Sequence, residues 1–171
     1  MRELVYRRSL RLPWPSGRWS NWSRGQRTEG AALDRREPNR HLFAGNWSGE
    51  GTVKTSAGSE RIRCKAHYDV TSDGTSLQQT LLCASDSYKL HVRSNVAATG
   101  TRFVGKWNEV TRDTIGNISG TITSTGIRGK IDGIGFTADL AMSTQANRQS
   151  VTIDPTGATD ISQVAITLAR L

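Results

Sequence analysis

Hydrophobic and polar residues alternate without interruption over residues 61–70, the pattern of a β-strand with one buried and one exposed face. A second run covers residues 77–83, and Asp73-Gly74 between the runs is a hairpin turn signal. A turn at these two residues sets Cys64 opposite Cys83. The only two cysteines of the chain are therefore predicted to face each other across adjacent strands.

The same alternation continues along the chain, and each hairpin can be placed from its turn residues. The predicted inward-facing pairs are Trp47 with Tyr68, Val53 with Ile62, Leu81 with Leu90, Gln79 with Val92, Val96 with Phe103, Val92 with Trp107, Ile118 with Ile131, Ile122 with Ile127, Phe136 with Ile131, Leu140 with Ile127, Val151 with Met142 and Ile153 with Leu140. A final strand carries Val164, Ile166 and Leu168 on the same face. A slip of one residue at any hairpin would turn a strand inside out, so this agreement favours one continuous sheet.

Ten short strands follow one another, with no helical segment that could serve as a crossover. An even number of strands allows the last to pair antiparallel with the first, which removes both exposed edges of the sheet. We therefore predict an all-β, up-and-down barrel over residues 45–171, within one domain at 43–171. The alternative is a two-sheet β-sandwich of the same strands.

Residues 1–42 form a leader of different composition, rich in Arg and Trp and without an apolar period. Residues 1–43 hold ten Arg and four acidic residues, a net charge of +6, so the rest of the chain accounts for only +2 of the total of +8. Three interpretations remain open: a disordered or over-called extension, an arm for nucleic acid or another anionic surface, and an ordered element that covers the domain. The leader shows no secretory signal pattern.

A resemblance rests on the start of the domain. Gly45-Asn46-Trp47 resembles the Gly-x-Trp that opens lipocalin and avidin barrels, and ten meandering strands are similar to the fatty-acid-binding proteins. All three are calycins, so the resemblance implies a ligand-binding barrel. The domain also resembles small exported bacterial β proteins of unassigned activity, on Asn46-Trp47-Ser48-Gly49 and the two cysteines. That resemblance implies export and no reaction.

The facing cysteines predict a disulfide, because directly opposed strand positions have the Cα separation that a disulfide requires. The alternative is a pair of buried thiols that pack as small apolar groups. A stable disulfide indicates an oxidising compartment, so we expect a periplasmic or secreted protein.

No motif for catalysis, a cofactor or a metal stands out. His67 and His91 are expected in one row on the outer face, about two strand spacings apart, which is roughly 9–10 Å and too far for a shared metal. His41 lies in the leader. There is no nucleophile–base pair, phosphate loop or paired-carboxylate spacing. We expect a protein that is not an enzyme and uses no cofactor.

Two inward rows suggest a hollow interior. One row supplies the aromatic and polar residues Trp47, Tyr68, Gln79 and Trp107, and we predict that these residues, together with Glu109 of the neighbouring row, bind a ligand. The neighbouring row is rich in small residues: Gly49, Ala66, Gly120, Gly129 and Ala138. If Glu109 points into an enclosed hollow, desolvation is expected to raise its pKa. The alternative is a filled core in which glycines mark strand bends.

These observations lead to two functional hypotheses. The first is a carrier or sensor of a small apolar or aromatic molecule held in the barrel. The second is a structural or interaction module of the cell envelope, with a protein partner at a basic outer face made of Arg61, Arg63, Lys65, Lys89, Arg93, Arg128 and Lys130. A nucleic-acid site is expected nowhere but in the leader. No apolar run approaches the ~18 residues of a membrane-spanning helix.

Overall fold

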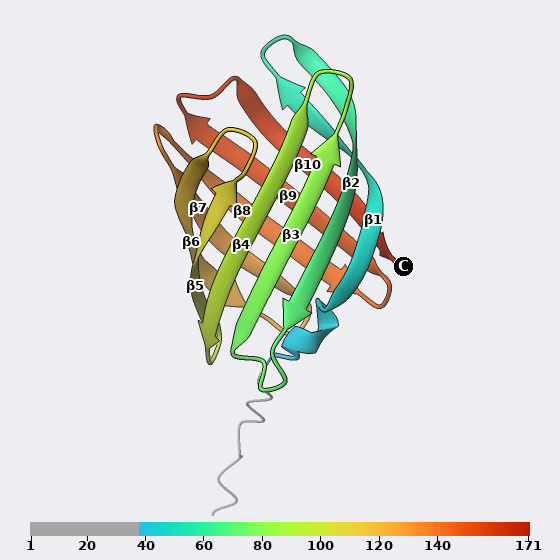
Figure 1. Ribbon diagram of the computed structural model, residues 1–171, viewed down its shortest axis with the longest axis vertical. Coiled ribbons are helices and arrows are strands. Elements are labelled where there is room, and N and C mark those ends of the chain that lie inside the picture. The colour runs from blue at the N-terminus through green and yellow to red at the C-terminus, as the bar shows by residue number, and fades with distance from the viewer. Residues whose placement is uncertain (1–37) are drawn as a thin grey trace, which may run out of the picture. The chain divides into compact units, whose positions relative to one another are not determined.

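The computed structural model describes residues 38–171, which form one short 3-10 helix and ten strands (Figure 1). The elements are η1 (Arg40–Leu42), β1 (Gly45–Thr55), β2 (Gly58–Val70), β3 (Ser76–Ala84), β4 (Lys89–Thr99), β5 (Arg102–Glu109), β6 (Thr114–Ile122), β7 (Gly126–Gly133), β8 (Phe136–Gln145), β9 (Arg148–Gly157) and β10 (Ile161–Arg170). No helix in residues 38–171 has the length and hydrophobicity of a membrane span. The predictions for residues 1–37 lie outside the described part of the chain.

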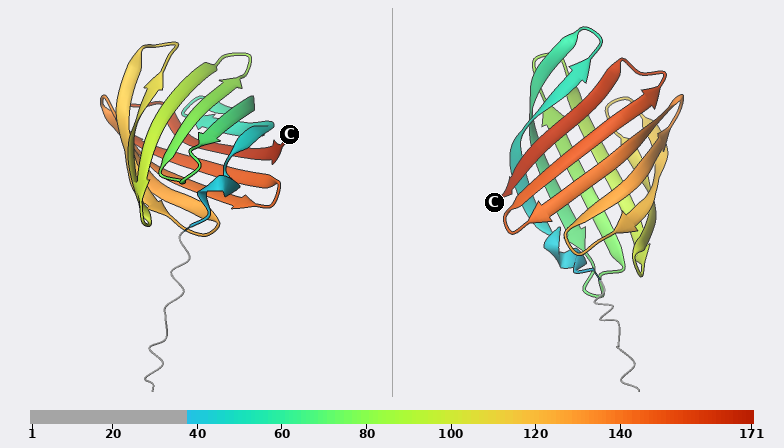
Figure 2. Two further views of the ribbon diagram at one scale, coloured as in Figure 1. Left: turned by 60° about the horizontal axis from the view of Figure 1, so that its bottom comes forward. Right: turned by 180° about the vertical axis from the view of Figure 1, so that it is seen from behind.

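The ten strands form a closed antiparallel barrel. Each strand pairs with its neighbour in sequence, and β10 returns to pair with β1 from Trp47–Arg170 to Val53–Val164 (Figures 1 and 2). The predicted up-and-down barrel is confirmed, and the sandwich alternative is wrong. Closure leaves no strand edge unpaired, which explains why a sheet of short, turn-connected strands needs no covering layer.

The register was predicted correctly at three hairpins. Cys64 pairs with Cys83 between β2 and β3, Ile118 pairs with Ile131 between β6 and β7, and Met142 pairs with Val151 between β8 and β9. At these three hairpins the turn residues chosen from the sequence are the ones about which the strands pair.

Four other hairpins are shifted by two residues from the prediction. Trp47 pairs with Ala66 instead of Tyr68, and Leu81 pairs with Val92 instead of Leu90. The β4–β5 and β7–β8 pairs shift in the same way. In the β4–β5 hairpin the loop is Gly100-Thr101, with Gly100 at a φ of 55°, one position later than predicted. A shift of two keeps every side chain on its predicted face, so the inside of the barrel is unaffected.

The start of the described chain closes one end of the barrel, which we call the floor. Helix η1 lies across this end, at the bottom of Figure 1, and Phe43, the residue that follows it in sequence, is almost fully buried at 1% exposure. The side chain of Arg170 at the end of β10 donates hydrogen bonds to the carbonyl oxygens of Ala44 and Leu42. Residues 40–42, which the prediction from sequence assigned to the leader, therefore belong to the barrel domain.

The disulfide between Cys64 and Cys83 is present, as predicted, with a Cα–Cα distance of 4.1 Å. Both residues are buried in a core cluster with Trp47, Ile62 and Leu168. The bond therefore joins β2 and β3 from the inside of the barrel.

Candidate functional site

The barrel encloses a cavity of about 490 Å³, a size within the range of small-ligand sites. Every strand except β1 contributes at least two side chains to its wall, and almost half of the lining residues are Ile, Leu or Val. The central aliphatic residues are Leu77, Leu81, Val92, Val96, Ile118, Ile127, Ile131, Leu140, Val151, Ile153, Val164 and Ile166. The interior is therefore hollow and apolar. The alternative of a filled core does not fit this cavity.

Four of the five predicted ligand-binding residues line this cavity: Tyr68, Gln79, Trp107 and Glu109. They come from three strands, and the observed register places Tyr68 opposite Gln79 and Glu109 opposite Val92. A role for these residues in binding remains a prediction.

Trp47, the fifth predicted residue, does not line the cavity. Its exposure is 0%, its indole N–H donates to the carbonyl oxygen of Phe43 at 3.0 Å, and the guanidinium of Arg170 lies 4.3 Å from the ring centroid. The cation–π contact and the hydrogen bond fix the ring in the floor. Trp47 therefore closes the barrel. The sequence showed that it faces inward but not that η1 packs beneath it.

A buried polar group lies toward the floor. The Tyr68 hydroxyl donates to Gln149 Oε1 at 2.8 Å, and Gln149 Nε2 donates to Thr144 Oγ1 at 3.2 Å. Burial raises the pKa of Tyr68, and a hydrogen bond from Gln79 only partly opposes this, so the phenol stays protonated. Ser94 donates to Gln79 Oε1 at 2.7 Å. These bonds satisfy groups that would be costly to bury alone.

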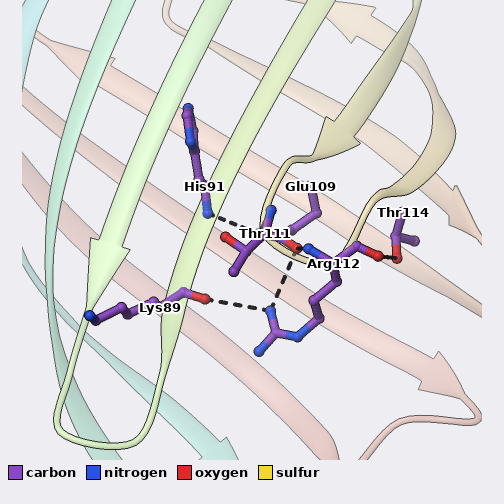
Figure 3. A network of polar contacts seen from close by, with 6 residues as sticks. All are labelled: Lys89, His91, Glu109, Thr111, Arg112 and Thr114. Carbon is purple, nitrogen blue, oxygen red and sulfur yellow. Dashed lines mark hydrogen bonds and ion pairs between the residues drawn. The ribbon is translucent and has the colours of Figure 1, made fainter.

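Glu109 lies at the opposite end of the barrel, which we call the mouth, where β5 runs into the 110–113 loop. Its carboxylate accepts backbone hydrogen bonds from His91 at 3.0 Å, Thr111 at 3.2 Å and Arg112 at 2.7 Å (Figure 3). The Arg112 guanidinium lies 3.7 Å from the same carboxylate and donates to the carbonyl oxygen of Lys89 at 3.5 Å. This network ties the loop to β4 at the mouth.

The predicted rise in the Glu109 pKa is wrong. Burial raises the pKa, but the hydrogen bonds from His91, Thr111 and Arg112 together outweigh it, and the pKa lies below its ordinary value. Three backbone N–H groups converge on a carboxylate that is only 5% exposed. Glu109 is therefore an ionised anchor for the loop. Its carboxylate is occupied by the protein's own donors.

The inward glycines do not provide the free space that the sequence suggested. A Cβ on Gly116 would lie 2.6 Å from the Trp107 ring, and a Cβ on Gly129 would lie 2.9 Å from Phe103. At Gly49 and Gly120 a Cβ would meet the carbonyl oxygen of a neighbouring strand at 2.0 Å and 2.2 Å. The glycines therefore allow close approach of rings and strands. The cavity is bounded instead by aliphatic side chains that do not reach across the barrel.

The histidines take different positions from those expected. His67 lies opposite Thr80, but Thr80 pairs with Arg93, so His91 is two positions out of that row. The His67 ring is within hydrogen-bond distance of Asn46 Oδ1 at 2.7 Å and Asp69 Oδ2 at 3.0 Å. Among residues 38–171, no group of three His, Cys, Asp or Glu side chains lies close enough to hold a metal ion.

Several cavity residues were missed by the sequence reasoning. Tyr88, Arg112 and Asp160 lie at the mouth, with the Tyr88 hydroxyl 3.5 Å from Asp160 Oδ2. Arg40 lies at the floor, inside the segment assigned to the leader. All four belong to turns or to the leader, where no alternation indicates which side chains face the interior.

Comparison with known proteins supports the architecture. The solved structure of Rv2717c from M. tuberculosis matches with a TM-score of 0.62 and 12% identity, over 76% of this chain and 93% of that chain. The S-type phycobiliprotein lyase CPES from Guillardia theta matches with a TM-score of 0.57 and 8% identity, over 77% and 90%. No family model matches the sequence, and no curated protein matches it. The closed ten-strand barrel is calycin-like, and at these identities the likeness shows the fold alone.

Proposed function

We propose that this protein is a non-enzymatic carrier or sensor that binds a small, largely apolar molecule inside its barrel. The observation that carries the proposal is the cavity of about 490 Å³, whose wall is largely apolar, with Ile, Leu and Val as its commonest residues and polar groups such as Arg40 and Glu109 toward its two ends. Burying apolar ligand surface against such a wall contributes about 25 cal/mol per Å² before the cost of association. Protein interiors are normally close-packed, so a barrel with a purely structural role would not need a cavity of this size.

The two ends of the cavity differ, and this difference supports entry of the ligand at the mouth. The floor is closed by η1, Phe43 and Trp47, whereas the mouth is bordered by turns and by the Glu109–Arg112 network. A ligand would enter past the 110–113 loop. Trp107 lines the cavity and packs near Phe136, with ring centroids 6.1 Å apart, so its fluorescence should report the occupancy of that region.

The disulfide supports an exported location, periplasmic or secreted. Cys64 and Cys83 are joined, a state that is compatible with an oxidising compartment and rare in reducing ones. A ligand carrier in such a compartment would meet molecules that cross the cell envelope.

The test is a fluorescence titration of the full chain with N-phenyl-1-naphthylamine, a neutral probe that brightens in apolar surroundings. Leu140→Trp places a large ring in the cavity from the middle of β8, and Ser143→Trp places the same ring on the exposed face of that strand. We expect saturable binding in wild type and Ser143→Trp and its loss in Leu140→Trp. Equal binding by all three proteins would overturn the proposal.

A second candidate is an interaction module, and one observation favours it. A shallow depression crosses the outer face of β1–β4, where Arg63, Lys65 and Lys89 surround Leu82, which is 47% exposed. None of these three cations belongs to an ion pair among residues 38–171. An acidic protein surface would fit this face. Loss of a partner on charge reversal of Lys65, with the neutral probe still bound, would separate this function from the first.

A further inference from the structure

A buried arginine lies at the floor of the cavity. Arg40 is only 7% exposed and lines the cavity, and its guanidinium bridges two turns. One Nη donates to the carbonyl oxygen of Gly74 at 2.8 Å, and the other donates to the carbonyl oxygen of Gly100. These contacts hold the side chain across the floor, between the β2–β3 and β4–β5 turns.

The charge of Arg40 has no acidic partner among residues 38–171. The ion pairs there join Arg61 to Glu50, His67 to Asp69, Arg112 to Glu109 and Lys130 to Asp139. Arg40 Nε is buried without any hydrogen-bond partner. A buried cation whose N–H groups are only partly satisfied is costly unless an anion accompanies it.

The other buried charge in the cavity wall is too far away to compensate. Glu109 ends β5 at the mouth, whereas Arg40 contacts the turn that begins β5 at the floor. The two end residues of the eight-residue strand β5 are seven residue steps apart, which is roughly 23 Å along the strand. Glu109 is also already bonded to three backbone N–H groups and faces Arg112.

From this arrangement we infer that the ligand is an amphipathic organic anion. Its head group, a carboxylate or sulfonate, is bound by the free N–H groups of Arg40, and its apolar body fills the aliphatic wall above. A guanidinium presents planar donors that match such oxyanions, and hydrogen bonds between charged groups are about twice as strong as neutral ones. The inference rests on the proposed function, since it names the ligand class of the same cavity.

Two probes with the same ring system test the inference. N-phenyl-1-naphthylamine is neutral, and 8-anilino-1-naphthalenesulfonate adds only a sulfonate to it. In wild type we expect the sulfonate to bind more tightly by about tenfold or more, since a hydrogen bond between charged groups contributes about 1.5–3 kcal/mol. Without a buried cation, the more hydrophobic neutral probe would bind more tightly, and that result would overturn the inference.

Arg40→Gln should remove the preference for the sulfonate while the neutral probe still binds. Arg170→Gln is the matched control, because Arg170 also donates to floor carbonyl groups, those of Ala44 and Leu42, but does not line the cavity. We expect Arg170→Gln to keep the preference. An unchanged preference in Arg40→Gln, or an equal loss in both variants, would contradict a site at Arg40.

Two further measurements keep the test decisive if Arg40→Gln does not fold. Leu140→Trp should abolish binding of both probes, whereas sulfonate binding that survives in Leu140→Trp would indicate the basic outer face. In wild type, the affinity for the sulfonate probe should change little as salt is raised, because buried ion pairs are screened much less than exposed ones. A steep loss of affinity with salt would overturn the inference.

The two probes also separate the inference from the proposed function. If only the neutral probe bound, the proposed function would stand and the inference would fail. If neither probe bound, the inference and the proposed function would both fail.

Discussion

Replacing Glu109 by Gln should destabilise the barrel even though the two side chains have nearly the same shape. One carboxylate oxygen accepts hydrogen bonds from the backbone N–H groups of His91 and Thr111, and the other accepts from Arg112. In Glu109→Gln, one of these oxygens becomes an NH₂ group. A donor then faces a donor, at the mouth of the barrel where little water reaches the group.

The size of the effect follows from these contacts. Leaving one buried donor unsatisfied costs about 1–3 kcal/mol, and the remaining hydrogen bonds lose the strengthening that a charged acceptor gives. We therefore expect Glu109→Gln to lower the free energy of unfolding by about 2 kcal/mol at pH 7. Asp113→Asn is the control, because Asp113 belongs to the same loop but is exposed.

The loss of stability in Glu109→Gln should depend on pH. Because the pKa of Glu109 is lowered in the folded protein, its ionised form stabilises the fold above the ordinary carboxyl pKa, and this contribution disappears as the pH falls through the folded-state pKa. The difference between wild type and Glu109→Gln should therefore be full at pH 7 and shrink as the solution becomes strongly acidic.

Urea unfolding of the full chain, followed by tryptophan fluorescence at several pH values, measures this difference. The account of the loop anchor would be refuted if Glu109→Gln unfolded at the same urea concentration as wild type at pH 7. It would also be refuted if Asp113→Asn lost as much stability.

Three other changes test the account. Cys64 and Cys83 are 19 positions apart in sequence, so reducing their disulfide should lower the free energy of unfolding in urea by about 3 kcal/mol. An unchanged urea midpoint would contradict a stabilising disulfide. Tyr68→Phe leaves Gln149 Oε1 without its hydrogen-bond donor and should lower the free energy of unfolding by about 1–3 kcal/mol, measured by thermal unfolding. A melting temperature equal to that of wild type would argue against the buried hydrogen bond. Gly116→Ala places a Cβ 2.0 Å from the carbonyl oxygen of Asp132 and 2.6 Å from the Trp107 ring, so it should cost about 1–3 kcal/mol in urea unfolding and shift the tryptophan emission. An unchanged emission would mean that the Trp107 ring lies elsewhere.

The alternation of hydrophobic and polar side chains was enough to predict the fold. Its period is two residues, so an error of two residues in the strand register leaves every side chain on the same face of the sheet. The β4–β5 hairpin shows this: the predicted turn was one residue early, yet Val96 and Phe103 both face inward. The turn position depends on which residue adopts a positive φ, here Gly100, and that choice is not visible in the alternation.

The candidate site was predicted less completely, since it depends on contacts between distant segments. Trp47 was expected to face a ligand, but η1 and Arg170 enclose it from below. Glu109 was expected in an apolar hollow, but the 110–113 loop folds three backbone N–H groups onto it. Arg40 lies in a segment without any period, so only its packing in three dimensions shows that it reaches the cavity.

The most direct test of the central claim is a crystal structure of the full chain bound to N-phenyl-1-naphthylamine. The account predicts density for the probe inside the barrel, against Leu140, Ile153 and Trp107, with η1 still closing the floor. Density confined to the outer depression around Leu82, with the interior occupied by rearranged side chains, would contradict it.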